Sequence, residues 1–339
     1  MAQMGYVIGV DAGASKTFCL AAQTDGVITG FGKSGPGNFE TIGIDVAKAN
    51  ILASVEESLD ESDISNEDVE FGCFCLAGAD FYPEDWDMLT KAVEELGVAR
   101  EFTIRNDSIA GLRAGIHRPY GVCIAMGSGF NGAGIGKDGR EVRYFSEGYI
   151  FGDLGGGGAI ARDALYHAMR AYDGRGKPTA LMQIALDHWG AKDMEQLARV
   201  LYYERQSWKK IPGMCPKVFE AAYAGDEVAT GIIRRFGEEA GISANALIRR
   251  LGLEDEEFEV VLAGSVFKGQ GPLMIDTARE IIRPVAPKAK VITPRYEPVV
   301  GALMLALEGM GIAIQGEVDR NLDSSVPQEL RRNQTGCTR

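Results

Sequence analysis

Short apolar runs separated by turn residues dominate the first part of the chain. One run spans residues 6–10 and ends at Asp11, and a second spans residues 18–22. The turn Asp25-Gly26 then leads into a third run over residues 27–31. Runs of this length between turn signals predict three strands joined as a meander.

Helix and strand patterns alternate after the meander. Apolar residues at helical spacing mark 45–59 and 84–96, whereas 71–76 is an unbroken apolar run typical of a buried strand. A shorter strand over 102–104 ends just before a helix that starts at Ser108. The pattern predicts a mixed sheet with helices on its faces.

The same order of elements then repeats with different residues. Three further strands are predicted at 121–126, 132–135 and 141–145, separated by the glycine turn 127–131 and by Asp138-Gly139. Strand, glycine turn, strand, Asp-Gly turn and strand therefore occur twice. We interpret this as an internal duplication in which each half contributes one glycine loop to a shared cleft.

The rest of the second half is mainly helical. Residues 156–251 carry apolar positions at helical spacing, with Arg and Glu on the opposite face. Strands are predicted at 258–263 and 290–293, with a helix at 272–282 between them and a last helix at 299–307. The chain is therefore predicted to be α/β throughout.

Composition narrows the class of protein. The 339 residues are 45% apolar and 24% charged, with a net charge of −13. This composition is typical of globular proteins, and the length is sufficient for two domains. The negative net charge argues against nucleic acid or an anionic membrane as a partner. The chain shows no signal-peptide pattern and no apolar run of about 20 residues, so we expect a cytoplasmic location. Its six cysteines form no CxxC pair and are expected to be reduced.

The stretch from Asp11 to Thr17 is the first candidate for chemistry. Its glycine turn lies between two strands, whereas a Walker P-loop or a Rossmann glycine loop opens onto a helix. Backbone N–H groups in such a turn can face a phosphate, and the adjoining carboxylate can face its metal ion. An ordinary hairpin whose Asp ends a strand explains the stretch as well.

An ordered set of short segments carries a more specific signal, and it resembles the BadF/BadG/BcrA/BcrD ATPase family. Within that family it is similar to the N-acetylglucosamine and glucosamine kinases, which belong to the actin, Hsp70 and sugar-kinase superfamily. The resemblance extends from Tyr6 to about Leu307. The segments are Asp11–Thr17, Asn106-Asp107, Gly127–Asn131, Gly152-Asp153 and Ala263–Lys268.

The resemblance implies two ribonuclease-H-like lobes with an ATP cleft between them. The first lobe would be residues 1–118 and the second 119–316, with the helical region 156–251 inserted in the second. The terminal helix 299–309 is expected to pack back on the first lobe. Residues 317–339 are polar and are expected to form a mobile tail.

The resemblance also implies roles for individual residues. Asp11 would hold Mg²⁺ through water, and Asp107 would be the catalytic base that accepts the proton of a sugar hydroxyl. Residues expected to contact the nucleotide are Gly13, Ala14, Ser15, Lys16, Thr17, Gly127, Ser128, Gly129, Gly264 and Ser265. Residues expected to contact the sugar are Asn38, Asp107, Asn131 and Asp153.

Each assignment has an ordinary alternative. Asp107 precedes Ser-Ile-Ala-Gly and could be a helix N-cap. Asn38, Asn131 and Asp153 are residue types that are frequent in turns, and Lys16 could be a solvated turn lysine.

Two departures from the kinases concern the acceptor. The kinases commonly have Gly-Asp-Glu-Gly-Ser where this chain has Leu154 and Gly156 in place of the acidic residue and the serine. They often place a glycine pair and a Trp upstream, where this chain has Glu147-Gly-Tyr149. A shifted amino-sugar preference, or another sugar altogether, is therefore open.

The expected function is ATP- and Mg²⁺-dependent phosphorylation of N-acetylglucosamine, glucosamine or a related hexose to its 6-phosphate, by a homodimer. A second reading is an ATPase that activates a dehydratase or reductase through an iron–sulfur cluster, for which Cys73 and Cys75 are the nearest ligands. A third is a sugar sensor without catalysis, although the presence of both Asp11 and Asp107 argues against it.

Overall fold

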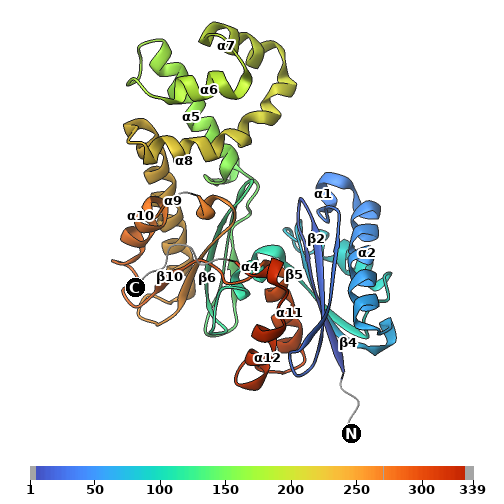
Figure 1. Cartoon of the computed structure of the whole chain (residues 1–339). Helices are drawn as coiled ribbons and strands as arrows, with labels where there is room; N and C mark the ends of the chain where they lie inside the picture. Colours follow the sequence, from blue (N-terminus) through green and yellow to red (C-terminus); the bar gives the residue numbers. More distant parts are fainter. Residues whose placement is uncertain (1–4, 270, 333–339) are drawn as a thin grey trace. The chain divides into compact units, whose positions relative to one another are not determined.

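The protein consists of two compact units, each built on its own five-stranded sheet (Figure 1). A computed structural model describes residues 5–269 and 271–332. Unit 1 extends to Pro119 and resumes at Pro294, and unit 2 extends from Tyr120 to Thr293. The α/β class and the duplicated strand pattern are confirmed.

The sheet of unit 1 has the order β3-β2-β1-β4-β5. The first three strands form the predicted antiparallel meander, and β4 and β5 continue parallel to β1. Because parallel strands end at the same edge of a sheet, the carboxyl ends of β1, β4 and β5 lie together. The strands are β1 (Tyr6–Ala12), β2 (Thr17–Gln23), β3 (Ile28–Ser34), β4 (Val69–Leu76) and β5 (Glu101–Asn106).

Helices cover both faces of this sheet, as Figure 1 shows. One face packs against α2 and α3 around Ile51, Val55 and Leu89. The other face packs against α4, α11 and α12 around Val300, Leu303 and Leu322. The helices are α1 (Phe39–Ile42), α2 (Ile44–Ser62), α3 (Glu84–Glu94), α4 (Asp107–Arg113), α11 (Pro298–Gly309) and α12 (Glu317–Ser325), with a 3-10 turn η1 (Asn66–Asp68).

The close approach of α11 depends on glycines. A Cβ on Gly9 of β1 would lie 2.2 Å from the backbone nitrogen of Leu303, and one on Gly301 would lie 2.0 Å from the carbonyl oxygen of Ala110 in α4. No side chain fits at either contact. Helix α11, which covers the residues of the predicted last helix, therefore packs on β1 and α4 through backbone-to-backbone contacts.

Gly9→Ala should destabilise unit 1 by about 2 kcal/mol or more, because the methyl group meets a backbone atom that cannot rotate away. Urea unfolding of the purified protein measures the effect. Gly111→Ala is the matched control, since a Cβ at Gly111 meets nothing within 4 Å and alanine is the better helix former by up to about 1 kcal/mol. Equal unfolding midpoints for the two variants would show that the close contact is not required.

Residues 317–332 are not the mobile tail that we expected. They form α12 and a 3-10 turn, η5 (Gln328–Leu330), which bury Leu322 and Leu330. Ser325 Oγ accepts a hydrogen bond of 2.9 Å from the N–H of Ile28 on edge strand β3. The segment has few apolar residues, but these are sufficient for it to pack on unit 1 because edge strand β3 also supplies a backbone hydrogen bond. Residues 333–339, including Cys337, lie outside the described residues.

The sheet of unit 2 has the order β10-β9-β6-β7-β8, which matches the topology of unit 1 strand for strand. Its strands are β6 (Gly121–Met126), β7 (Phe130–Ile135), β8 (Glu141–Arg143), β9 (Glu259–Ala263) and β10 (Lys290–Ile292). Helix α9 packs on β6 and β7, and α10 packs on α9. The helical region forms the rest of the unit, with α5 (Gly157–Tyr172), α6 (Leu181–Trp189), α7 (Met194–Tyr203), α8 (Cys215–Tyr223), α9 (Glu227–Leu251) and α10 (Leu273–Ile282). Its 3-10 turns are η2 (Tyr149–Phe151), η3 (Arg205–Met214) and η4 (Val266–Lys268).

The cysteines of the described chain are buried thiols. Cys19, Cys73, Cys75, Cys123 and Cys215 are all free, as expected from the sequence. Among the described residues, the helices are too short or too polar to cross a bilayer.

Candidate functional site

Asp11 lies at the carboxyl end of β1, in the middle of the sheet of unit 1. Its side chain is buried, and it makes no hydrogen bond to any residue that the structure describes. Burial, and next the carboxylate of Asp107, raise the pKa of Asp11 from 3.8 to about 7, although Lys16 opposes the shift. A buried carboxylate without a donor is a group that a cation would stabilise.

The turn that follows Asp11 is tight and mostly exposed. The N–H of Gly13 donates to the carbonyl of Lys16 over 3.0 Å, which closes the turn. Ala14, Ser15 and Lys16 are exposed, whereas Thr17 is fully buried. The backbone of the turn can therefore meet a ligand, but the Thr17 hydroxyl cannot reach the surface in this conformation.

Lys16 is an exposed turn lysine that also has two partners within the chain. Its ammonium lies 3.4 Å from Glu297 Oε2 and 3.9 Å from the ring centre of Phe18. Glu297, which precedes α11, also accepts a hydrogen bond of 3.0 Å from Arg332 Nε. Two cations and one carboxylate thus surround the Asp11 turn.

Asp107 is the first residue of α4, and its N-cap is Asn106. Asn106 Oδ1 accepts hydrogen bonds from the N–H of Ser108 at 3.1 Å and from its hydroxyl at 2.5 Å. The alternative reading of Asp107 as the cap is therefore wrong. The half-buried Asp107 carboxylate is close enough to Asp11 to raise its pKa, so the structure brings together the two carboxylates that the sequence singled out.

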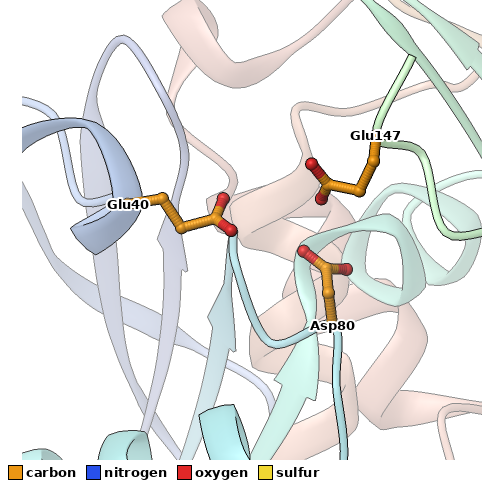
Figure 2. Close-up of side chains that lie close together, drawn as sticks. All are labelled: Glu40, Asp80 and Glu147. Atoms are coloured by element: carbon orange, nitrogen blue, oxygen red, sulfur yellow. The ribbon is translucent and has the colours of Figure 1, made fainter. Parts of the chain in front are cut away.

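Asp80 orients Asn106 from the loop after β4. Asn106 Nδ2 donates to Asp80 Oδ1 over 3.0 Å. The carboxylates of Asp80 and Glu40 lie within 4.8 Å of each other and are turned toward one another in Figure 2. Figure 2 also draws Glu147, which unit 2 carries between β8 and η2.

Asn38 is the N-cap of α1. Its Oδ1 accepts a hydrogen bond of 2.8 Å from the N–H of Glu40. Asn38 therefore has the structural role in a turn that was given as the alternative to sugar binding. Its amide nitrogen Nδ2 lies 3.4 Å from Glu40 Oε2.

Three glycine segments meet in unit 2. The loop 127–129 is closed by a 3.1 Å hydrogen bond from the N–H of Gly127 to the carbonyl of Gly129, and the N–H of Gly157 donates back to Gly127 at 2.8 Å. Gly156 and Gly264 have φ of +84° and +97°, and a Cβ on either would come within 2.6 Å of backbone in or next to this loop. The backbone conformation at position 156 therefore requires glycine in this chain, where the kinases commonly have serine. Ser265, beside Gly264, is exposed and immediately precedes η4.

Asp153 and Asn131 lie on neighbouring segments of the same unit. The Asp153 side chain is buried and accepts a hydrogen bond of 2.8 Å from the N–H of Gly148. Burial nevertheless raises the pKa of Asp153. Asn131 Oδ1 lies 2.9 Å from Ser146 Oγ, so both polar side chains are fixed by the loop that follows β8.

Sequence reasoning assigned no role to Asn106 and missed Glu297 and Arg332. Asn106 is next to a residue that was singled out, and an Asn two positions before a helical N–H is a readable cap signal. Lys16 and Glu297 are 281 positions apart, so no local pattern joins them.

The geometry around Asp11 fits a divalent cation. The Asp107 carboxylate contributes to the raised pKa of Asp11, and both carboxylates are oxygen ligands of the kind that Mg²⁺ prefers. Burial makes the negative charge of Asp11 unfavourable, and this raises the pKa of the carboxyl to about 7.

Comparison with known proteins places these features in context. The sequence model of the BadF/BadG/BcrA/BcrD ATPase family matches residues 8–306. The chain is 31% identical over 312 residues to the N-acetyl-D-glucosamine kinase of Dictyostelium discoideum, an alignment that covers 88% of this chain and 97% of that kinase. It is 28% identical over 303 residues to the N-acetylmuramic acid/N-acetylglucosamine kinase of Clostridium acetobutylicum, covering 89% of this chain and 98% of the relative.

A solved structure shares the fold. It is that of a candidate N-acetylglucosamine kinase of Chromobacterium violaceum, with a TM-score of 0.67 and 22% identity over 89% of this chain and 99% of the other. The two-unit architecture is therefore the one adopted by that protein.

Proposed function

The chain belongs to the BadF/BadG/BcrA/BcrD ATPase family, and we propose that it transfers the γ-phosphoryl group of ATP to a sugar hydroxyl. The acceptor is N-acetylglucosamine, glucosamine or a related hexose, and the product is its 6-phosphate. The observation that carries the proposal is the pair Asp11 and Asp107 at one sheet edge, in a chain whose curated relatives are amino-sugar kinases.

Asp107 acts as the base. The sugar hydroxyl gives its proton to the Asp107 carboxylate while its oxygen forms a bond to the γ-phosphorus. The bond from that phosphorus to the β,γ-bridging oxygen breaks, and its electron pair leaves with ADP. Phosphoryl transfer needs mainly positioning and charge stabilisation. A single oriented carboxylate is therefore sufficient to activate the acceptor hydroxyl.

Asp11 would hold Mg²⁺ through water, and the ion would neutralise phosphate charge when bound. The turn from Gly13 to Thr17 and the loop from Gly127 to Gly129 present backbone N–H groups to the phosphates. Gly264 and Ser265 take the adenosine. These assignments are supported by the glycine geometry and the exposed turn residues.

Asn38, Asn131 and Asp153 recognise the sugar. Asp153 is the best supported of the three, because its buried carboxylate is held by Gly148 and lines a cavity. The homodimer stays a prediction.

The positions of the two candidate cluster ligands, Cys73 and Cys75, argue against the dehydratase-activator alternative. Cys73 and Cys75 are fully buried inside β4, with their sulfur atoms 3.8 Å apart. Thiols in that position cannot share a cluster with another subunit. Purification without oxygen should give a colourless protein, and an iron–sulfur absorbance would revive the alternative.

A coupled ADP-release assay over a panel of hexoses and amino sugars tests the proposed function. With Mg²⁺ and ATP, we expect sugar-dependent ADP release that is greatest for N-acetylglucosamine or a related amino sugar. The rate without sugar is the control. ADP release that does not change with any sugar would contradict a kinase.

A further inference from the structure

The C-terminal segment (residues 317–332) ends beside Glu297, the N-cap of α11. The N–H of Arg332 donates to the carbonyl of Arg295 over 2.8 Å, and the N–H of Glu297 donates to the carbonyl of Leu330 over 2.8 Å. Backbone bonds therefore hold the end of the segment in place. The match to the family's sequence model ends before this segment begins, so the contact lies outside the part of the chain that the family model describes.

Glu297 lies between two cations. Its Oε1 accepts a hydrogen bond of 3.0 Å from Arg332 Nε, and the side chains of Arg332 and Glu297 are only 13% and 15% exposed. Its Oε2 lies 3.4 Å from the ammonium of Lys16. Burial raises the pKa of Asp11 and the charge of Arg332 opposes that shift. The last described residue of the chain thus contributes charge at the carboxyl end of β1.

Lys16 is the cation of this group that a ligand can reach. Its side chain is 47% exposed, and its ammonium lies 3.9 Å from the ring centre of Phe18. Phe18 in turn packs edge-to-face on Phe31, with ring centres 5.2 Å apart. The ammonium is therefore held at the surface of the turn that follows Asp11, with the Glu297 carboxylate as its charged neighbour.

The charge balance of these three side chains depends on Arg332. With Arg332 in place, two cations share one carboxylate, and one positive charge remains for a ligand. Without it, Glu297 and Lys16 would neutralise each other, and an uncompensated, mostly buried carboxylate would compete with any phosphate at the turn. The carboxylates of Asp11 and Asp107 have other partners in the proposed reaction, the metal ion and the sugar hydroxyl.

We infer that Arg332 is a positioning residue of the nucleotide site, which pairs with Glu297 and so leaves the ammonium of Lys16 free to meet the terminal phosphates of ATP. This inference rests on the proposed function. The phosphates that meet the turn are the terminal ones because the turn adjoins Asp11, close to the proposed base Asp107. The C-terminal segment is then part of the nucleotide site, although its residues contact no substrate.

Calorimetric binding of ATP and AMP to the full-length protein, with Mg²⁺ present, tests the inference. Arg332→Gln should raise the Kd for ATP by about 10-fold or more, the contribution of a hydrogen bond to a charged group. The Kd for AMP, measured by competition with ATP, should stay within about twofold, because AMP lacks the terminal phosphates. Equal losses for the two nucleotides would overturn the inference, since they would show a general disturbance of unit 1.

A second substitution should suppress the first. In the double variant Glu297→Gln/Arg332→Gln, no carboxylate remains to capture Lys16 or to repel phosphate. We expect its Kd for ATP, and that of Glu297→Gln alone, to lie within about threefold of the wild-type value. A double variant as weak as Arg332→Gln would contradict charge compensation, because the two effects would then not depend on one another.

Arg331→Gln is the matched control. Arg331 is the neighbouring arginine of the same segment, and its Nη1 lies 3.4 Å from Asp323 Oδ1 within that segment. Its replacement can loosen the segment, which thermal unfolding of all the variants measures, but it should leave the Kd for ATP within about twofold. If Arg331→Gln weakens ATP binding as much as Arg332→Gln does, packing of the segment explains the effect and the inference is wrong.

The outcomes separate the inference from the proposed function, because nucleotide binding requires neither a sugar nor turnover. If ATP binds with the predicted dependence on Arg332 but no sugar is phosphorylated, the inference stands and the kinase fails. If Arg332→Gln binds ATP as the wild-type protein does and sugar phosphorylation persists, the inference fails and the kinase stands. A wild-type protein that binds no ATP would overturn both.

Discussion

Asp107→Asn should lower kcat for sugar phosphorylation by about 10²–10⁴-fold, the range that a general base contributes. Asparagine keeps the shape of the side chain but cannot accept the hydroxyl proton. The cap of α4 is Asn106 and not Asp107, so the helix should keep its start. Steady-state kinetics with a saturating amino sugar measures the loss, and nucleotide affinity should stay within about threefold because Asp107 has no role in holding ATP.

Asp87→Asn provides the control for this variant. Asp87 is an exposed acid in the first turn of α3 of the same unit, and its replacement should leave kcat unchanged. Near-normal turnover by Asp107→Asn would remove Asp107 from the chemistry and leave the reaction without an identified base.

Asp11→Asn should abolish Mg²⁺-dependent turnover and, at the same time, stabilise the metal-free protein at alkaline pH. The pKa of Asp11 is raised from 3.8 to about 7 in the folded state. Protonated Asp11 is therefore favoured by folding, and the stability linked to it is present below about pH 4 and is lost as the pH rises through 7. Each tenfold change in proton affinity is about 1.4 kcal/mol, so the cost at pH 8 is on the order of a few kcal/mol.

Thermal unfolding of both proteins from pH 4 to pH 8 measures this difference. Asp11→Asn and the wild-type protein should unfold at similar temperatures at pH 4, and the variant should be more stable at pH 8. Addition of Mg²⁺ and ATP should stabilise the wild-type protein only. A constant difference across this pH range would show that Asp11 is not the buried titrating group.

The strand pattern could be predicted from sequence because its signals are local. Glycine turns and short apolar runs predict the two three-stranded meanders. The duplication is predicted because the same order of strands and turns occurs twice. The segment 317–332 was assigned to a tail because its composition is polar. Its packing depends on Leu322 and Leu330 joining a core whose strand residues lie more than 200 positions earlier in the sequence. A local sequence pattern cannot predict such a long-range contact.

The candidate site divides in the same way. Asp11 and Asp107 could be singled out because each follows a predicted strand. The Lys16–Glu297–Arg332 cluster could not, because ion pairs between distant residues leave no periodic signal. The departures from the kinase pattern at Leu154 and Gly156 left the choice of acceptor open. The structure explains Gly156 by its positive φ and places Leu154 beside Asp153 in the cavity wall.

Direct detection of the product tests the central claim. The wild-type protein is incubated with Mg²⁺, ATP and N-acetylglucosamine, and phosphorus NMR follows the new phosphomonoester while ADP is measured in the same sample. We predict one sugar 6-phosphate formed for each ADP, and neither product with Asp107→Asn. ADP accompanied by inorganic phosphate instead of a sugar phosphate would show an ATPase and would contradict the account.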